Sequence, residues 1–286
     1  MSDQRSHTDQ SWRLEHDSLG DVPVPAERYW GAQTERARHR FQIGNDPIPL
    51  ELIHAIACLK RMAAHTNRGL GVLDEQRCDW ISEAAQEVER GEWDGEFPLS
   101  CWQSGSGTQT NMNVNEVIAN RACELAGKPR GSREVVHPND HVNRSQSTND
   151  VFPCAIHLAA ERQQRQALLP ALRKLVHTLQ SKATSWADVV KIGRTHLQDA
   201  VPLTVGQEVG GWAAQLQSAA ERLEQGLVEL RSIPLGGTAV GTGLGAPKGY
   251  PEAVCQQLSA CEGVEWRSDG NRFALMGSHD ALVQQM

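Results

Sequence analysis

Apolar residues recur at helical spacing over most of the chain. In the first such stretch they fall three or four positions apart, at Leu52, Ile56, Leu59 and Met62. A second helix is expected over residues 74–88 and a third from about residue 110 to residue 125, which Gly127 and Pro129 then terminate. The pattern therefore predicts three helices of moderate length in the first half of the chain.

Two longer helical patterns follow. One contains leucines at intervals of four, three and four residues (Leu168, Leu172, Leu175 and Leu179), and Pro170 is expected to bend this helix rather than end it. The other alternates intervals of four and three almost throughout, at Val205, Val209, Trp212, Leu216, Ala219, Leu223, Leu227 and Leu230. Such a narrow apolar seam is typical of a helix in a bundle.

The intervening segments are predicted to be loops. Residues 91–103, 130–150, 190–202 and 234–250 are polar or rich in glycine, and the first 50 residues are mixed and turn-rich. A short helix is expected near residues 251–261, and residues 280–286 are interpreted as a helix that the sequence cuts short. No repeat of fixed period is found.

Composition narrows the class of protein. The 286 residues are 39% hydrophobic and 22% charged, which is ordinary for a globular chain and excludes a disordered or collagen-like one. A net charge of -7 disfavours nucleic acid as a partner, because phosphate binding needs a basic face. No apolar stretch is long enough for a membrane span, and residues 1–10 are polar and carry acids, unlike a targeting peptide.

The cysteines and histidines give no clear metal site. The seven cysteines are widely spaced without a CxxC pair, so reduced thiols in a cytoplasmic protein are the simplest expectation. His137 and His141 are four residues apart but lack an obvious third ligand. We expect no metal site at these residues.

Three polar clusters stand next to predicted helix ends. The first, Gln103–Glu116, carries two glycines with Ser106, Thr108 and Thr110 at a helix start. Unpaired backbone N–H groups and the helix dipole favour an anion there. The alternative is a capping loop whose side chains only satisfy the helix end. The segment is neither a P-loop nor a nucleophile elbow, because it lacks the lysine of the one and the first glycine of the other.

The second and third clusters have the same character. His137–Asp150 places Ser147, Thr148 and Asn149 before the long helix, and local chemistry alone favours His137 as an exposed capping residue. Gly193–Pro202 contains His196, which could carry a proton if a carboxylate orients it or could be structural. Because all three clusters offer mainly uncharged donors at helix ends, a site assembled from several helices, of several subunits, is a reasonable hypothesis.

Together the three segments resemble the fumarase/aspartase superfamily, and within it the class II fumarate hydratases. The resemblance begins at Arg28–Thr34 and is carried most specifically by the text Gly-Ser-Gly-Thr-Gln-Thr-Asn-Met-Asn from Gly105. It implies an all-α fold in which a small N-terminal domain, residues 1–147, precedes a long-helix bundle domain, residues 148–286. It also implies a homotetramer whose helices pack into one bundle.

The resemblance further implies a reaction and roles for individual residues. The reaction is the reversible hydration of fumarate to (S)-malate in the tricarboxylic acid cycle, through an aci-carboxylate carbanion and without a cofactor. Ser106, Gly107 and Thr108 would bind one substrate carboxylate, Ser147, Thr148 and Asn149 would hold the substrate from a second subunit, and Thr195 would bind it too. His196 would transfer a proton. His137, Pro138, Asn139 and Asp140 match a secondary dicarboxylate site.

The sequence departs from the family pattern in two places. Arg133-Glu134-Val135-Val136 precedes His137, where family members often have basic residues. The serine loop that carries the proton-abstracting base is expected after Met286, so the chain is expected to be a C-terminally truncated subunit with an incomplete bundle, inactive alone. The alternatives are an aspartate ammonia-lyase-like enzyme and a non-catalytic truncated subunit.

Overall fold

The computed structural model describes residues 11–268 and 270–286, and the polar segment 1–10 lies outside the described residues. The chain forms two compact units. The first comprises the residues up to Ala159 together with Ser232–His279, and the second comprises Ala160–Arg231 and Asp280–Met286. The domain division at residue 147, which the resemblance implied, stays a prediction.

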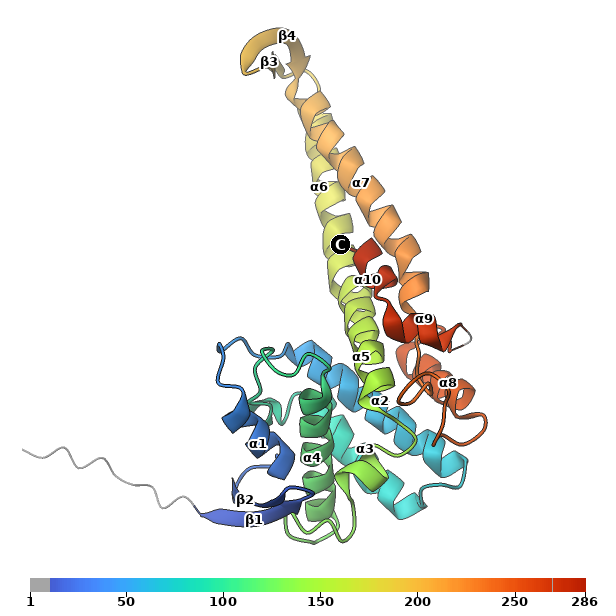
Figure 1. The fold of residues 1–286 in the computed structure, drawn as a ribbon. Helices are drawn as coiled ribbons and strands as arrows, with labels where there is room; N and C mark the ends of the chain where they lie inside the picture. The colour runs from blue at the N-terminus through green and yellow to red at the C-terminus, as the bar shows by residue number, and fades with distance from the viewer. Residues whose placement is uncertain (1–10, 269) are drawn as a thin grey trace, which may run out of the picture. The chain divides into compact units, whose positions relative to one another are not determined.

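The first unit packs helices around one apolar core (Figure 1). It opens with an antiparallel hairpin of β1 (Trp12–Asp17) and β2 (Gly20–Pro25). The helices that follow are α1 (Ala32–Arg40), α2 (Leu50–Gly69), α3 (Glu75–Glu89), α4 (Thr108–Leu125), the start of α5 (Thr148–Gln163), α8 (Tyr250–Glu262) and α9 (Arg272–Gly277). The helices predicted over 52–62, 74–88, 110–125 and 251–261 are therefore confirmed.

Helix α2 lies at the centre of this core. Its residues Ile53, Ile56 and Leu59 are at most 1% exposed, and α3, α4 and α8 all contact it. Helix α4 is also buried over most of its surface, and several of its polar side chains form hydrogen bonds with neighbouring backbone. Glu116, for example, accepts hydrogen bonds from the N–H groups of Gln33 and Thr34 in the first turn of α1.

The second unit is built on two long helices. Helix α6 (Leu169–Ser185) continues from α5 through five residues with a wider π-type turn (Gln164–Leu168), and Pro170 follows this turn directly. The chain thus stays helical through the proline, as predicted. Helix α7 (Val205–Leu230) packs along α6, and the short α10 (Asp280–Gln284) contacts α7 (Figure 1).

The apolar seam predicted along α7 is buried only in part. Val209, Leu227 and Leu230 are buried, whereas Trp212 is 51% exposed. Small residues complete the buried stripe, because Gly206 and Ala213 let the helices approach closely. A Cβ at Gly206 would come within 2.5 Å of the carbonyl oxygen of Ala183. One face of the seam therefore packs on α6, Val205, Leu216, Ala219 and Leu223 are partly buried, and Trp212 is exposed.

The loop predicted over residues 190–202 is instead an antiparallel hairpin of β3 (Val190–Thr195) and β4 (Gln198–Thr204). Thr195 pairs with Gln198, so His196 and Leu197 form a two-residue turn with φ of 51° and 62°. That turn type normally takes Asn or Gly. Because His196 and Leu197 occupy the turn instead, no hairpin could be predicted here. No helix in the described part of the chain is both long and apolar enough to cross a membrane.

Candidate functional site

The first predicted segment forms the N-terminus of α4. Gly107 precedes the helix with φ of +74°, and a Cβ there would lie 2.4 Å from the ring of Phe152. Only glycine fits both constraints. The chain thereby exposes Ser106 and Thr108, whose hydroxyl oxygens are 3.1 Å apart.

Two glutamines hold this loop in shape. Gln103 donates to the Thr110 hydroxyl at 2.9 Å and accepts from the Thr110 backbone N–H at 3.2 Å. Gln109 accepts from the backbone N–H of Ser104 at 2.9 Å. Because these amides bind the loop, the hydroxyls of Ser106 and Thr108 are not needed to cap the helix. Gln103 thus satisfies a backbone N–H in the first turn of α4, as the capping-loop alternative expects, and anion binding by Ser106 and Thr108 stays a prediction.

The second predicted segment forms the N-terminus of α5. Thr148 is buried, and its hydroxyl accepts a hydrogen bond from Asn111 of α4 at 2.9 Å. Asn149 is exposed and donates from Nδ2 to the carbonyl oxygen of Ala239 at 2.7 Å. Its backbone N–H lies 3.3 Å from the Ser147 hydroxyl, which accepts from it.

These two segments meet in one cavity of about 410 Å³. Ser106, Thr148 and Asn149 supply polar groups, whereas Gly107, Thr108 and Ser147 lie outside its lining. The other wall is formed by Gly105, Phe152, Pro153, Ile156, Ala239, Met276 and His279. Although the resemblance implied that the second segment comes from another subunit, a single chain brings the two together. A larger cavity of about 590 Å³ borders Gln103 and Gln109 but none of the predicted substrate residues.

A buried carboxylate beneath the cavity connects its parts. Asp150 is fully buried and accepts from the backbone N–H of Ser147 at 2.9 Å, of Gly236 at 3.0 Å and of Thr238 at 2.9 Å. Burial raises its pKa to about 6, although the three N–H groups and Lys60 oppose the shift. Asp150 is not among the predicted site residues. The spacing Ser147-x-x-Asp150 is that of a capping box and could have indicated it.

Lys60 of α2 is a second buried ionisable residue, and it interacts electrostatically with Asp150. It is fully buried and donates to the Asn143 side-chain oxygen at 2.7 Å. Burial lowers its pKa to about 7, and the carboxylate of Asp150 opposes that shift. No sequence signal could have found it, because a lysine in a helix is usually on the surface.

The predicted secondary site lies in the same unit. His137, Pro138 and Asn139 line a cavity of about 310 Å³, which Asp140 does not reach. Burial lowers the pKa of His137, and its Nδ1 accepts from the backbone N–H groups of Asn139 and Asp140 at 3.3 and 3.2 Å. We therefore assign the proton to Nε2 of a neutral ring, so that the nearby Asp140 carboxylate forms no ion pair with it.

Thr195 and His196 belong to the second unit, at the turn of the β3–β4 hairpin. Both are exposed, and φ of 51° puts His196 in the left-handed region that a non-glycine residue rarely adopts. Such strain is most common at functional sites.

In the part of the chain that is described, one group of three possible metal ligands occurs (Cys58, Cys261 and Glu262), and none of them lines the cavity described above.

The cavity generates a prediction about Gly107. Replacing it by alanine forces a Cβ into both a left-handed backbone and the Phe152 ring, so Gly107→Ala should lower the free energy of unfolding by about 3 kcal/mol in urea titrations. Gly105→Ala is the matched control, because its φ is +83° but nothing lies within 4 Å of the added Cβ. It should cost about 1 kcal/mol. Equal costs for the two variants would contradict the close contact with Phe152.

Lys60 generates a prediction about pH. Its pKa is about 7 in the folded state against an ordinary value of 10.5, so between these values the unfolded chain binds more protons and stability rises with pH. Relative to Lys60→Met, the natural chain should gain about 2 kcal/mol of unfolding free energy between pH 7 and pH 9. Urea titrations at both pH values measure this, with the exposed Lys248→Met as control. A pH-independent difference would show that Lys60 keeps its proton.

Comparison with known proteins places the chain in a family. A model of the lyase family matches residues 20–286. The class II fumarate hydratase of Thermosynechococcus vestitus is 55% identical over 271 residues, 95% of this chain and 58% of the relative. That of Prochlorococcus marinus (strain MIT 9313) is 54% identical over 96% of this chain and 59% of the relative.

A solved structure agrees with the sequence relatives. The crystal structure of a class II fumarase from Schistosoma mansoni aligns with a TM-score of 0.93 and 43% identity, over 96% of this chain and 61% of that one. The match confirms the predicted mostly helical, fumarase-like fold. The chain spans about three-fifths of the length of these relatives. It belongs to the lyase family and, within it, to the class II fumarate hydratases.

Proposed function

We propose that the whole protein catalyses the reversible hydration of fumarate to (S)-malate, as a cytoplasmic step of the tricarboxylic acid cycle. The observation that carries the proposal is the cavity in which Ser106, Thr148 and Asn149 converge, in a chain 55% identical to a class II fumarate hydratase. Because this chain spans only part of that relative's length, the activity is proposed for the protein at the length of its relatives.

The polar groups of the cavity suit the chemistry. Removing a proton from malate C3 leaves a carbanion whose charge spreads into the neighbouring carboxylate, which then carries close to two negative charges. Hydroxyl and amide donors that are already oriented stabilise such a species without reorganising. Ser106 and Thr108 lie at the positive end of the α4 dipole, and Asn149 lies at the positive end of the α5 dipole. Both helix ends therefore favour negative charge on the substrate.

His196 is proposed to transfer the proton, with Thr195 binding the substrate beside it. In the turn of the hairpin, its ring is exposed and its backbone is held away from the regular strand conformation. We propose that the site is completed in a homotetramer. This is supported by apolar side chains left exposed on the second unit, namely Leu175 at 47%, Trp212 at 51% and Val228 at 53%.

We propose that the cavity at His137 binds dicarboxylates as a secondary site, and weakly. A neutral His137 offers one N–H, while Asp17 and Glu116 contribute carboxyl groups to the same cavity. Arg133 also lines it, but its guanidinium lies 3.2 Å from Glu15 and is partly neutralised there. Nearby acidic side chains disfavour a dianion.

The double variant Ser106→Ala/Thr108→Val tests the role of the donors. In the protein extended to the length of its relatives, kcat/KM for fumarate should fall at least 100-fold, because losing one preorganised donor to a developing oxyanion costs about that much. Ser104→Ala is the matched control, since Ser104 is a hydroxyl residue of the same loop to which the family resemblance assigns no substrate contact, and it should change kcat/KM by less than about threefold. Undiminished hydration by the double variant would overturn the proposal.

The same assay tests the alternative reactions. Incubating the enzyme with fumarate, with and without added ammonia, distinguishes a fumarate hydratase from an aspartate ammonia-lyase. We expect malate as the product in both cases and no aspartate. Assaying residues 1–286 alone tests the expectation that this chain does not turn over fumarate by itself.

A further inference from the structure

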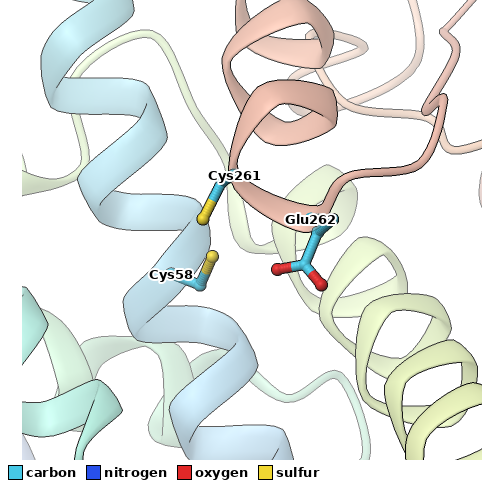
Figure 2. A group of neighbouring side chains, drawn as sticks. All are labelled: Cys58, Cys261 and Glu262. Atoms are coloured by element: carbon cyan, nitrogen blue, oxygen red, sulfur yellow. The ribbon is translucent and has the colours of Figure 1, made fainter.

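Two cysteines face each other where α2 and α8 pack together in the first unit (Figure 2). Cys58 is on α2 and is fully buried, whereas Cys261 is at the end of α8 and is exposed. Figure 2 shows their sulfur atoms pointing toward one another, with the Glu262 carboxylate to one side. The ligand atoms of all three residues lie within 4.8 Å of each other.

A cation holds the exposed sulfur. Arg61, one helical turn after Cys58, donates to Cys261 Sγ at 3.3 Å. Glu89 of α3 orients Arg61 by accepting from its Nε at 3.1 Å and from a terminal nitrogen at 2.8 Å. A hydrogen bond from Cys58, followed by that of Arg61, lowers the pKa of the Cys261 thiol to about 6. At neutral pH Cys261 is therefore mainly a thiolate, the reactive form of cysteine.

We propose that Cys58 and Cys261 form a redox-active thiol pair that a hydroperoxide oxidises to a disulfide. The Cys261 thiolate attacks the terminal oxygen of the hydroperoxide, the O–O bond breaks, and the leaving oxygen takes up a proton as water or alcohol. Cys261 becomes a sulfenic acid. The Cys58 sulfur then attacks Cys261 Sγ, the S–O bond breaks, and the oxygen leaves as water with the Cys58 proton. Two thiols are oxidised and one hydroperoxide is reduced.

The division of exposure between the two cysteines fits this sequence. Cys261 is exposed to solvent and to a small oxidant, whereas Cys58 is buried in the core, where it can react with the oxidised sulfur of Cys261. A low-pKa, accessible cysteine next to a second thiol is the arrangement of a peroxide-sensing pair. The product would join α2 to α8, which are far apart in the sequence.

A metal site is the competing interpretation of the same residues. Two thiols and the Glu262 carboxylate are a plausible set of three ligands for zinc. However, the Arg61 guanidinium is within hydrogen-bonding distance of one of those ligands, and a second cation beside it would be repelled. The observations favour the thiol pair.

Oxidation of the purified, fully reduced 286-residue chain tests the proposal. We expect one equivalent of hydrogen peroxide at pH 7 to produce a Cys58–Cys261 disulfide, identified by peptide mass spectrometry after the remaining thiols are alkylated. In Cys58→Ala, the reaction should stop at a sulfenic acid on Cys261, which dimedone traps. In Cys261→Ser, Cys58 should stay reduced. Cys101→Ser, which removes the other exposed cysteine, is the matched control and should leave the disulfide unchanged.

Arg61 provides a second readout that does not depend on folding of the cysteine variants. The rate of Cys261 alkylation should have its midpoint near pH 6. In Arg61→Gln it should move toward the value of an ordinary thiol, about 8.5, and Arg61→Lys should restore part of the shift. Peroxide that oxidises Cys101 as readily as Cys261, or that gives no Cys58–Cys261 disulfide in the natural chain, overturns the proposal. Tight binding of one zinc ion that protects both cysteines would establish the metal site instead.

Discussion

The three hydrogen bonds that the buried Asp150 carboxylate accepts hold the candidate site together. One comes from the residue before α5, and two come from the glycine-rich loop at Gly236 and Thr238. That loop carries Ala239, whose carbonyl oxygen in turn orients Asn149. A single side chain therefore sets the position of the substrate-facing amide, the helix end beside it and the loop that closes the cavity.

This arrangement has an electrostatic cost that the fold offsets locally. Burying a carboxylate is unfavourable unless it is paired with a charge and hydrogen-bonded. Here the three N–H groups supply the hydrogen bonds and Lys60 supplies the opposite charge. The polar groups that Ser106, Thr148 and Asn149 supply to the cavity are then all uncharged. Neutral donors bind a dianion without fixing one charge state, which suits a reaction whose intermediate is more negative than its substrate.

The helices and the helix-end location of the site could be predicted from sequence, and a few features could not. Periodicity located α2, α3, α4 and α7 because each has a clear apolar face. The seam of α7 was predicted too broadly, since Trp212 has the right spacing but is exposed, and the neighbouring glycine and alanine make the close contact. The β3–β4 hairpin was missed because its turn uses His196 and Leu197 against ordinary turn preference. Lys60 could not be predicted because its importance lies in a contact between distant segments. For Asp150, the spacing from Ser147 could indicate a helix cap but not the hydrogen bonds from Gly236 and Thr238.

Amide hydrogen exchange in Asp150→Asn tests the central claim most directly. An asparagine has one acceptor oxygen and cannot serve all three donors. The account predicts at least tenfold faster exchange at Ser147, or at Gly236 and Thr238 together, while core amides of α2 keep the rates of the natural chain. Unchanged protection at all three amides would contradict the claim that Asp150 organises the site.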